Sequence, residues 1–209
     1  ISAYGEPGFS VDKSKDKINE KHSSINNDQY YLIKNLEEID LWINEAEEIG
    51  EVAVDTETSS LDPHQADLIG ISLSSKIGKA CYIPIGHKSE KCLNKDLVLK
   101  KLKPLLEDSS IKKIGQNIKF DFIVFFKQGI ELNSMEDTML MSYVLDAGRN
   151  RHNMDTLSEI HLDHKTIAFK DVVGTGKKEI NFSEVDLKIA KNYAAEDADI
   201  TFRLYQKLK

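Results

Sequence analysis

Two acidic residues at the end of a short apolar stretch could together hold a metal ion. Asp55 and Glu57 follow Val52 and Val54, and this alternation is typical of a buried β-strand. Side chains two residues apart in a strand point to the same face, so the two carboxylates are expected to project side by side. Two unit charges about 4 Å apart repel by roughly 4 kcal/mol at an effective dielectric of 20, and a bound Mg²⁺, Mn²⁺ or Ca²⁺ would relieve that repulsion. The alternative is a strand that runs out into a solvated acidic turn.

A further acid lies in the middle of the chain, in a helix expected over residues 117–128. Asp121 has apolar neighbours on both sides, Phe120 and Phe122. An ionised carboxylate without a partner costs several kcal/mol to bury. Asp121 therefore either lies on an exposed stripe of this helix or faces a cation, and the helix alone favours exposure.

The last expected helix, from about residue 183 to 207, carries a tyrosine and an aspartate on one face. Tyr193 and Asp197 are four residues apart and are therefore neighbours on the helix surface. Glu196 and Asp199 point elsewhere on the helical wheel and are expected to face solvent. A half-buried tyrosine beside a surface aspartate is the alternative interpretation of the pair.

The rest of the chain supplies the elements that must position these side chains. Strands are expected at residues 30–33, 52–55, 68–74, 80–85, 111–114 and 130–132. Helices are expected over residues 35–50, 97–106, 117–128, 137–144, 154–162 and 183–207. A meander of strands followed by alternating strands and helices predicts an α/β fold, with a mixed sheet and helices on both faces.

Local signals fix several of the expected boundaries. Asn35, Asp96 and Asp137 are residue types that cap helix starts, and Gly50 is expected to end the first helix. The stretch 76–79 contains Gly78 and is expected to be the turn between two antiparallel strands.

Composition excludes several classes of protein. The chain has 209 residues, of which 40% are hydrophobic, so it is long enough to form one domain with its own core. Its net charge of −7 argues against a protein that coats DNA by bulk electrostatics, although bound cations could bridge carboxylates to phosphates. Neither a signal peptide nor an apolar run of membrane-spanning length is evident, so no membrane partner is expected. Cys81 and Cys92 provide no disulfide framework, which fits a reducing cytoplasm.

Other candidate sites are weaker. His152, His161 and His164 are expected to have surface or packing roles rather than to bind zinc. Residues 174–176 contain two glycines but are too few for a phosphate-binding loop. Residues 1–28 are polar, with few apolar anchors, and are expected to be a linker or flexible tail. The chain opens on Ile1 rather than Met, which suggests a piece of a longer protein.

Together, three short motifs resemble the exonuclease motifs of the acidic 3′–5′ exonuclease superfamily, in its tyrosine-bearing branch. They are Asp55-x-Glu57, Asn117-x-x-Phe120-Asp121 and Tyr193-x-x-x-Asp197. Longer stretches are similar to the proofreading domain of bacterial DNA polymerase I enzymes, namely residues 55–62, 82–87, 113–121, 137–140 and 193–199. The resemblance implies that residues 29–209 form a 3′–5′ exonuclease domain with a ribonuclease H-like fold.

The resemblance also implies catalysis with two divalent cations, Mg²⁺ or Mn²⁺, with Zn²⁺ as an option at one position. Asp55, Glu57 and Asp197 would hold the first cation. Asp55 would bridge to the second, to which Asp121 would contribute directly or through water. Tyr193 would orient the attacking water rather than deprotonate it.

Substrate contacts follow from the same resemblance. Leu61 and Phe169 would wedge and stack the terminal bases, which is a sequence-tolerant form of recognition. The residues that would reach sugar or phosphate are Gln116, Asn117 and Arg151. Phe120 stands where the polymerase I enzymes often carry Tyr, so any hydrogen bond from that hydroxyl is absent here.

The resulting hypothesis is a 3′–5′ exonuclease that removes nucleotides from single-stranded or frayed DNA. Its expected partners are a DNA 3′ end and the polymerase domain of the same parent chain, and the fragment itself is expected to be a monomer in the cytoplasm. An RNA 3′ exonuclease like ribonuclease D is one alternative. A non-catalytic DNA-binding module of a polymerase is another, although all four acids are present in this chain.

Overall fold

The computed structural model describes residue 25 and residues 29–88 and 92–209. The expected tail, residues 1–28, lies outside the described residues except for Ile25, which packs against the apolar cluster around Leu157. The strands are β1 (Gln29–Leu32), β2 (Glu51–Thr58), β3 (Leu68–Lys76), β4 (Lys79–Pro84), β5 (Lys112–Gly115) and β6 (Met135–Asp137). The helices are α1 (Leu36–Ile49), α2 (Lys95–Glu107), α3 (Lys119–Phe126), α4 (Thr138–Asp146), α5 (Met154–Leu162), α6 (Phe169–Val173) and α7 (Leu187–Leu208).

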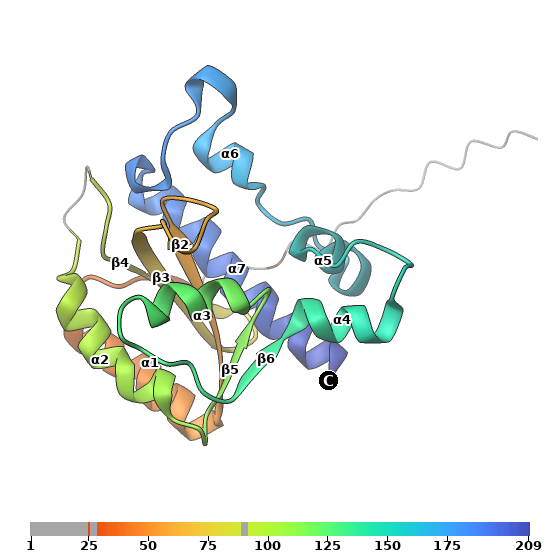
Figure 1. The fold of residues 1–209 in the computed structure, drawn as a ribbon, viewed down its shortest axis with the longest axis horizontal. Coiled ribbons are helices and arrows are strands. Elements are labelled where there is room, and N and C mark those ends of the chain that lie inside the picture. The colour runs from red at the N-terminus through yellow and green to blue at the C-terminus, as the bar shows by residue number, and fades with distance from the viewer. Residues whose placement is uncertain (1–24, 26–28, 89–91) are drawn as a thin grey trace, which may run out of the picture.

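These strands form one mixed sheet in the order β1-β4-β3-β2-β5-β6 (Figure 1). β3 is antiparallel to both of its neighbours, whereas the other pairs are parallel. The two-residue connection between β3 and β4 has Gly78 at φ +83°, a conformation that favours glycine, and confirms the expected turn. The α/β prediction with a mixed sheet is confirmed.

One expected strand is wrong. Residues 130–132 do not pair in the sheet, and the strand that does is β6, slightly later in the chain. The backbone of this segment bonds to helix ends instead: the Ile130 amide donates to the Phe125 carbonyl, and the Glu131 amide donates to the Glu107 carboxylate. Ile130 and Leu132 are nevertheless buried in the core. The segment therefore contributes apolar side chains to the core without being part of the sheet.

Helix boundaries follow local capping chemistry. The Asn35 side chain accepts from the Glu38 amide at 2.9 Å, and Asp137 accepts from the Met139 amide at 2.9 Å, as predicted. α2 starts earlier than expected, because Asn94 rather than Asp96 is its cap. The last helix starts later, at Leu187, because Phe182–Glu184 forms a separate 3₁₀ turn.

Helices cover both faces of the sheet, as expected (Figure 1). Val52 and Val54 belong to the main core with residues of α1, α2 and α3, whereas Ala53 packs with Phe202 of α7 on the other face. Because side chains alternate along β2, Asp55 and Glu57 share the face of Ala53. The sheet therefore directs both acids toward α7.

α7 is enclosed on more than one side. It lies across strands β1 to β5, and Ile200 on another side packs with Leu157 of α5. The expectation that Glu196 and Asp199 face solvent is wrong, since they are only 7% and 0% exposed. A helical wheel assumes one buried side, whereas α7 is packed between the sheet and α5. Among the described residues, none of the helices has both the length and the apolar character needed to cross a bilayer.

Candidate active site

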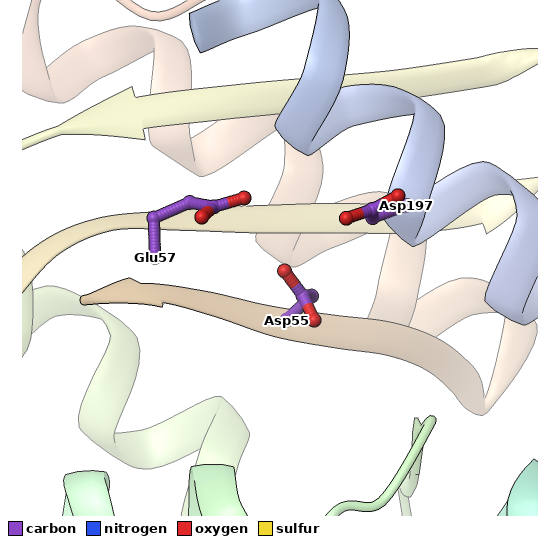
Figure 2. Close-up of side chains that lie close together, drawn as sticks. All are labelled: Asp55, Glu57 and Asp197. Atoms are coloured by element: carbon purple, nitrogen blue, oxygen red, sulfur yellow. The ribbon is translucent and has the colours of Figure 1, made fainter. Parts of the chain in front are cut away.

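Three carboxylates meet between β2 and α7. One ligand atom from each of Asp55, Glu57 and Asp197 lies within 4.8 Å of the others. Figure 2 shows Asp55 and Glu57 on the strand, with Asp197 approaching from the helix. The prediction that Asp55 and Glu57 share one face of a strand is confirmed. The third acid, Asp197, lies 142 positions after Asp55 in the chain.

The surroundings of these acids oppose their ionisation. Burial raises the pKa of Asp55 to about 6. Burial, followed by the charges of Asp55, Asp197 and Asp121, raises the pKa of Glu57 well above its ordinary value. The pKa of Asp197 is raised well above its ordinary value by burial and then by the charge of Asp55. Ionised together, the three would leave negative charge uncompensated in a site of reduced dielectric.

A divalent cation fits this set of residues. All three donors are carboxylates, which suit hard cations rather than thiolate-binding metals. Glu57 Oε1 is buried and makes no hydrogen bond within the part of the chain that the structure describes. A cation between the carboxylates would supply both a partner for this oxygen and the missing positive charge.

Asp121 does not lie on an exposed stripe of its helix, so the interpretation drawn from that helix alone is wrong. It is 3% exposed, and its Oδ1 accepts from the Thr56 amide at 2.9 Å and from the Thr56 hydroxyl at 2.6 Å. The pairing of β2 with β5 ends at Ala53, which frees this side of β2 to accept α3. Burial and then the charge of Asp55 raise the pKa of Asp121, against the lowering effect of the Thr56 bonds.

Tyr193 faces the same acids. Its hydroxyl interacts with the Asp197 carboxylate, one helical turn away. Burial and then the charges of Asp197, Glu57 and Asp55 raise the pKa of Tyr193. The hydroxyl therefore stays protonated at neutral pH and can position another group, but it is not a base.

A cleft of about 530 Å³ joins these side chains to the expected substrate contacts. It is lined by Asp55, Thr56, Glu57, Thr58, Leu61, Gln116, Asn117, Phe120, Asp121, Asn153, Phe169, Tyr193 and Asp197. Arg151 is exposed and does not line the cleft, whereas Asn153 does. The structure thus gathers every residue predicted for the site except Arg151.

Leu61 and Phe169, the two apolar residues expected to contact bases, differ in how much they pack against the rest of the protein. Leu61 is 92% exposed on the loop after β2. Phe169 is 44% exposed, and its ring stacks on Phe182 with centroids 6.3 Å apart and lies 5.9 Å from the ring of Tyr193. Both offer apolar surface to a ligand, but only Phe169 belongs to an aromatic cluster.

The floor of the cleft is held by polar contacts that the sequence did not predict. Asn117 has φ +61°, and its amide donates to Asp137 Oδ1, the same oxygen that caps α4. The Gln116 side chain donates to the His152 carbonyl and accepts from the Thr138 hydroxyl. Of these contacts, only the capping role of Asp137 was predicted from the sequence. Its hydrogen bond with Asn117 was not predicted, because the two residues are 20 positions apart.

His152 and His164 contact neighbouring side chains and are not part of a group with metal-ligand geometry among the described residues. His152 Nδ1 lies 2.9 Å from the Ser142 hydroxyl, and His164 Nε2 lies 3.0 Å from Glu196 Oε1. Among the described residues, the one group with metal-ligand geometry is the carboxylate cluster.

Sequence comparison places the chain among nucleases. The model of a family described as 3′–5′ exonuclease matches residues 30–209. The chain is 44% identical over 201 residues to DNA polymerase I of Rhizobium leguminosarum, an alignment that covers 86% of this chain and 20% of the relative. This chain therefore spans about a fifth of the length of the curated relatives it matches.

Structural comparison agrees with the fold. Brucella melitensis NrnC with bound Mg²⁺ superimposes with a TM-score of 0.62 and 26% identity, covering 86% of this chain and 79% of that one. Escherichia coli RNase D superimposes with a TM-score of 0.62 at 17% identity, covering 86% of this chain and 44% of that one, and at this identity the likeness shows the fold alone. The expected ribonuclease H-like fold is confirmed.

Proposed function

We propose that this chain, which belongs to the 3′–5′ exonuclease family, removes nucleotides from the 3′ end of single-stranded or frayed DNA as the proofreading part of a DNA polymerase I. The observation that carries the proposal is the meeting of Asp55, Glu57 and Asp197 in one cluster, with Asp121 and Tyr193 lining the same cleft. The polymerase assignment draws on relatives that are about five times as long as this chain. Because these relatives are bacterial DNA polymerases, a location in the cytoplasm is part of the proposal.

The acids would hold two divalent cations, Mg²⁺ or Mn²⁺. Asp55, Glu57 and Asp197 would bind one, and Asp55 with Asp121 would bind the other. When bound, such a pair supplies an activated water and stabilises charge on the leaving 3′ oxygen. Thr56 holds Asp121 through two hydrogen bonds, so the carboxylate is oriented before any ligand arrives.

The protein's own groups would place the substrate. The protonated Tyr193 hydroxyl would donate to Asp197, which would leave its oxygen free to accept a hydrogen bond from the attacking water. Leu61 and Phe169 would stack against bases at the 3′ end. A paired end must first unpair, at a cost of a few kcal/mol, so frayed ends should enter more easily.

A nuclease assay on end-labelled oligonucleotides tests the proposal. With Mg²⁺ or Mn²⁺ the 209-residue chain should shorten single-stranded DNA one nucleotide at a time, and chelation should abolish the reaction. A mismatched 3′ end should be cut about ten to a hundred times faster than a matched end, because unpairing is easier. Asp55→Ala is the control for a contaminating nuclease.

Two outcomes would contradict the proposal. Equal rates on matched and mismatched ends would refute proofreading. Faster cleavage of a single-stranded RNA than of the same DNA sequence would favour an activity like that of ribonuclease D.

A further inference from the structure

Glu196, the residue before Asp197, uses its whole carboxylate to hold a distant segment. Oε1 lies 3.0 Å from His164 Nε2, and Oε2 accepts from the Ile167 amide at 2.6 Å. The side chains of Glu196 and His164 are only 9% and 10% exposed, so this contact is shielded from water. Hydrogen bonds to a charged group in such a setting are stronger than neutral ones.

The segment held in this way leads directly to α6, which carries Phe169. α6 has only five residues, and no side chain caps its start at Ala168. A helix this short is not stable by itself, so its position depends on what fastens it. A second fastening comes from Thr166, whose hydroxyl donates to Asp155 Oδ1 at 2.7 Å on α5.

The fastening matters because Phe169 and α7 share the cleft. Phe169 lies 5.9 Å from the ring of Tyr193, and both line the cleft with Asp197. Glu196 lies on α7 between Tyr193 and Asp197, so it connects the exposed aromatic ring to the helix that carries the acid. Apolar packing of Val172 and Val173 also holds α6, but through its far end.

We propose that Glu196, assisted by His164, is a positioning residue that fixes Phe169 over the cleft and so strengthens binding of the nucleotide at the 3′ end. The inference rests on the proposed function, because Phe169 must stack on a base for its position to matter. Glu196 itself has no contact with the substrate in this scheme.

Glu196→Ala removes both contacts and should raise KM for a short single-stranded DNA about tenfold, which is the size of one lost base-stacking contact. The kcat should change by less than about twofold, since loss of uniform binding affects KM alone. Glu196→Gln keeps the shape but loses the charge, so its KM should be closer to that of the unaltered chain than to that of Glu196→Ala. Its amide oxygen can accept from Ile167, and its NH₂ can donate to a neutral His164. His164→Ala, which loses one contact, should be intermediate.

A double-mutant cycle separates this role from a general structural one. In a Phe169→Ala background, Glu196→Ala should add nothing to KM, because two residues that act through one contact are not additive. Affinity for Mn²⁺ alone, measured by calorimetry, should be equal in Glu196→Ala and the unaltered chain. Glu159→Ala, an exposed acid on α5, is the matched control.

Binding of an oligonucleotide with 2-aminopurine at its 3′ end, followed by fluorescence quenching in Ca²⁺, supplies a readout that needs no turnover. The proposal is overturned if Glu196→Ala binds as tightly as the unaltered chain, if the effect persists without Phe169, or if Mn²⁺ affinity falls. An unaltered chain that binds DNA but cleaves nothing would refute the proposed function, and the double-mutant cycle would then be measured with the fluorescence dissociation constants in place of KM. If Glu196→Ala does not fold, His164→Ala in the same cycle decides.

Discussion

Asp197 and Asp199 are both buried on α7, two residues apart, but in opposite surroundings. Asp199 accepts hydrogen bonds from the Tyr30 hydroxyl at 2.7 Å, from the Gly78 amide at 2.7 Å and from the Arg203 guanidinium at 3.0 Å. Asp197 instead faces other acids, and among the described residues the Tyr193 hydroxyl is the group that favours its ionised form. Asp199 joins β1, the β3–β4 turn and α7, whereas Asp197 is repelled by the neighbouring carboxylates.

The difference separates two uses of a buried acid. Removal of a carboxylate surrounded by donors destabilises the fold, because the buried donors lose the acceptor that compensates them. A carboxylate surrounded by carboxylates makes the metal-free fold less stable, because compensation must come from outside. Burial alone therefore does not identify a functional acid. The groups around the acid do, since donors surround Asp199 and other carboxylates surround Asp197.

The largest expected effect is on catalysis. Asp197→Ala should lower cleavage by at least about a thousandfold, because cation-based stabilisation contributes several kcal/mol and each 1.36 kcal/mol is about tenfold. The metal-free variant should melt at the same temperature as the unaltered chain or higher, since repulsion is relieved. Nuclease assays and calorimetry check the two halves. A large fall in melting temperature would mean that Asp197 is structural.

Asp199→Ala should show the reverse pattern. Removing it leaves Tyr30, Gly78 and Arg203 without their acceptor, at a cost of about 3 kcal/mol in the free energy of unfolding. Urea denaturation measures this, and the variant should still cleave DNA at temperatures where it is folded. Tyr30→Phe is a milder control, with an expected cost of about 1 kcal/mol. Loss of activity in a fully folded Asp199→Ala would contradict the contrast.

Tyr193→Phe tests the interaction between the tyrosine hydroxyl and Asp197. Only the orientation of the attacking water should be lost, so kcat should fall about ten- to a hundredfold, less than for the acid. The aromatic packing with Phe169 is kept, so KM should hardly change. Steady-state kinetics distinguish this from a binding defect. An effect as large as that of Asp197→Ala would show that Tyr193 does more than position water.

The smallest expected effect is a pH dependence of stability without metal. Because the folded pKa of Asp55 is about 6, above its ordinary value of 3.8, the folded state binds more protons than the unfolded state between these values. The free energy of unfolding should therefore fall as pH rises, and the share of Asp55 alone is about 1–2 kcal/mol between about pH 5 and pH 7.5. Urea denaturation in chelator measures the slope.

Two controls sharpen the pH experiment. Saturating Mg²⁺ should reverse the slope, because a cation favours the ionised acids. Asp55→Ala should make the slope shallower without abolishing it, because burial still raises the pKa values of Glu57, Asp121 and Asp197. A metal-free protein that becomes more stable on raising the pH through this range would show that the acids are compensated within the fold.

Residue alternation and capping chemistry were sufficient to predict much of this structure. The shared face of Asp55 and Glu57 follows from the two-residue period of a strand, and the caps at Asn35 and Asp137 follow from side-chain oxygens that reach nearby amides. These are local relations that depend on few neighbours. The grouping of acids from β2, α3 and α7 came from the motif resemblance, since no local rule brings distant segments together.

Contacts between segments far apart in the chain were not predictable in this way. Glu196 and Asp199 were assigned to solvent because the sequence does not show which segments lie beside them. Glu196 is covered by the segment that contains His164 and Ile167, and Asp199 by β1 and the β3–β4 turn. Asp121 was assigned to an exposed stripe because its partner, Thr56, lies 65 residues away. Such contacts depend on packing, which a single sequence does not reveal without a family pattern.

The position of α7 in the chain has a consequence for biosynthesis. This helix contacts strands β1 to β5, and it carries the third carboxylate of the cluster. On the ribosome, residues emerge in order, so the sheet lacks the cover of α7, and the acids of β2 lack Asp197, until residues 187–208 have been made. A nascent chain halted before Leu187 thus has no complete cation-binding cluster. The carboxylate cluster is therefore completed only after α7 has emerged and packed on the sheet.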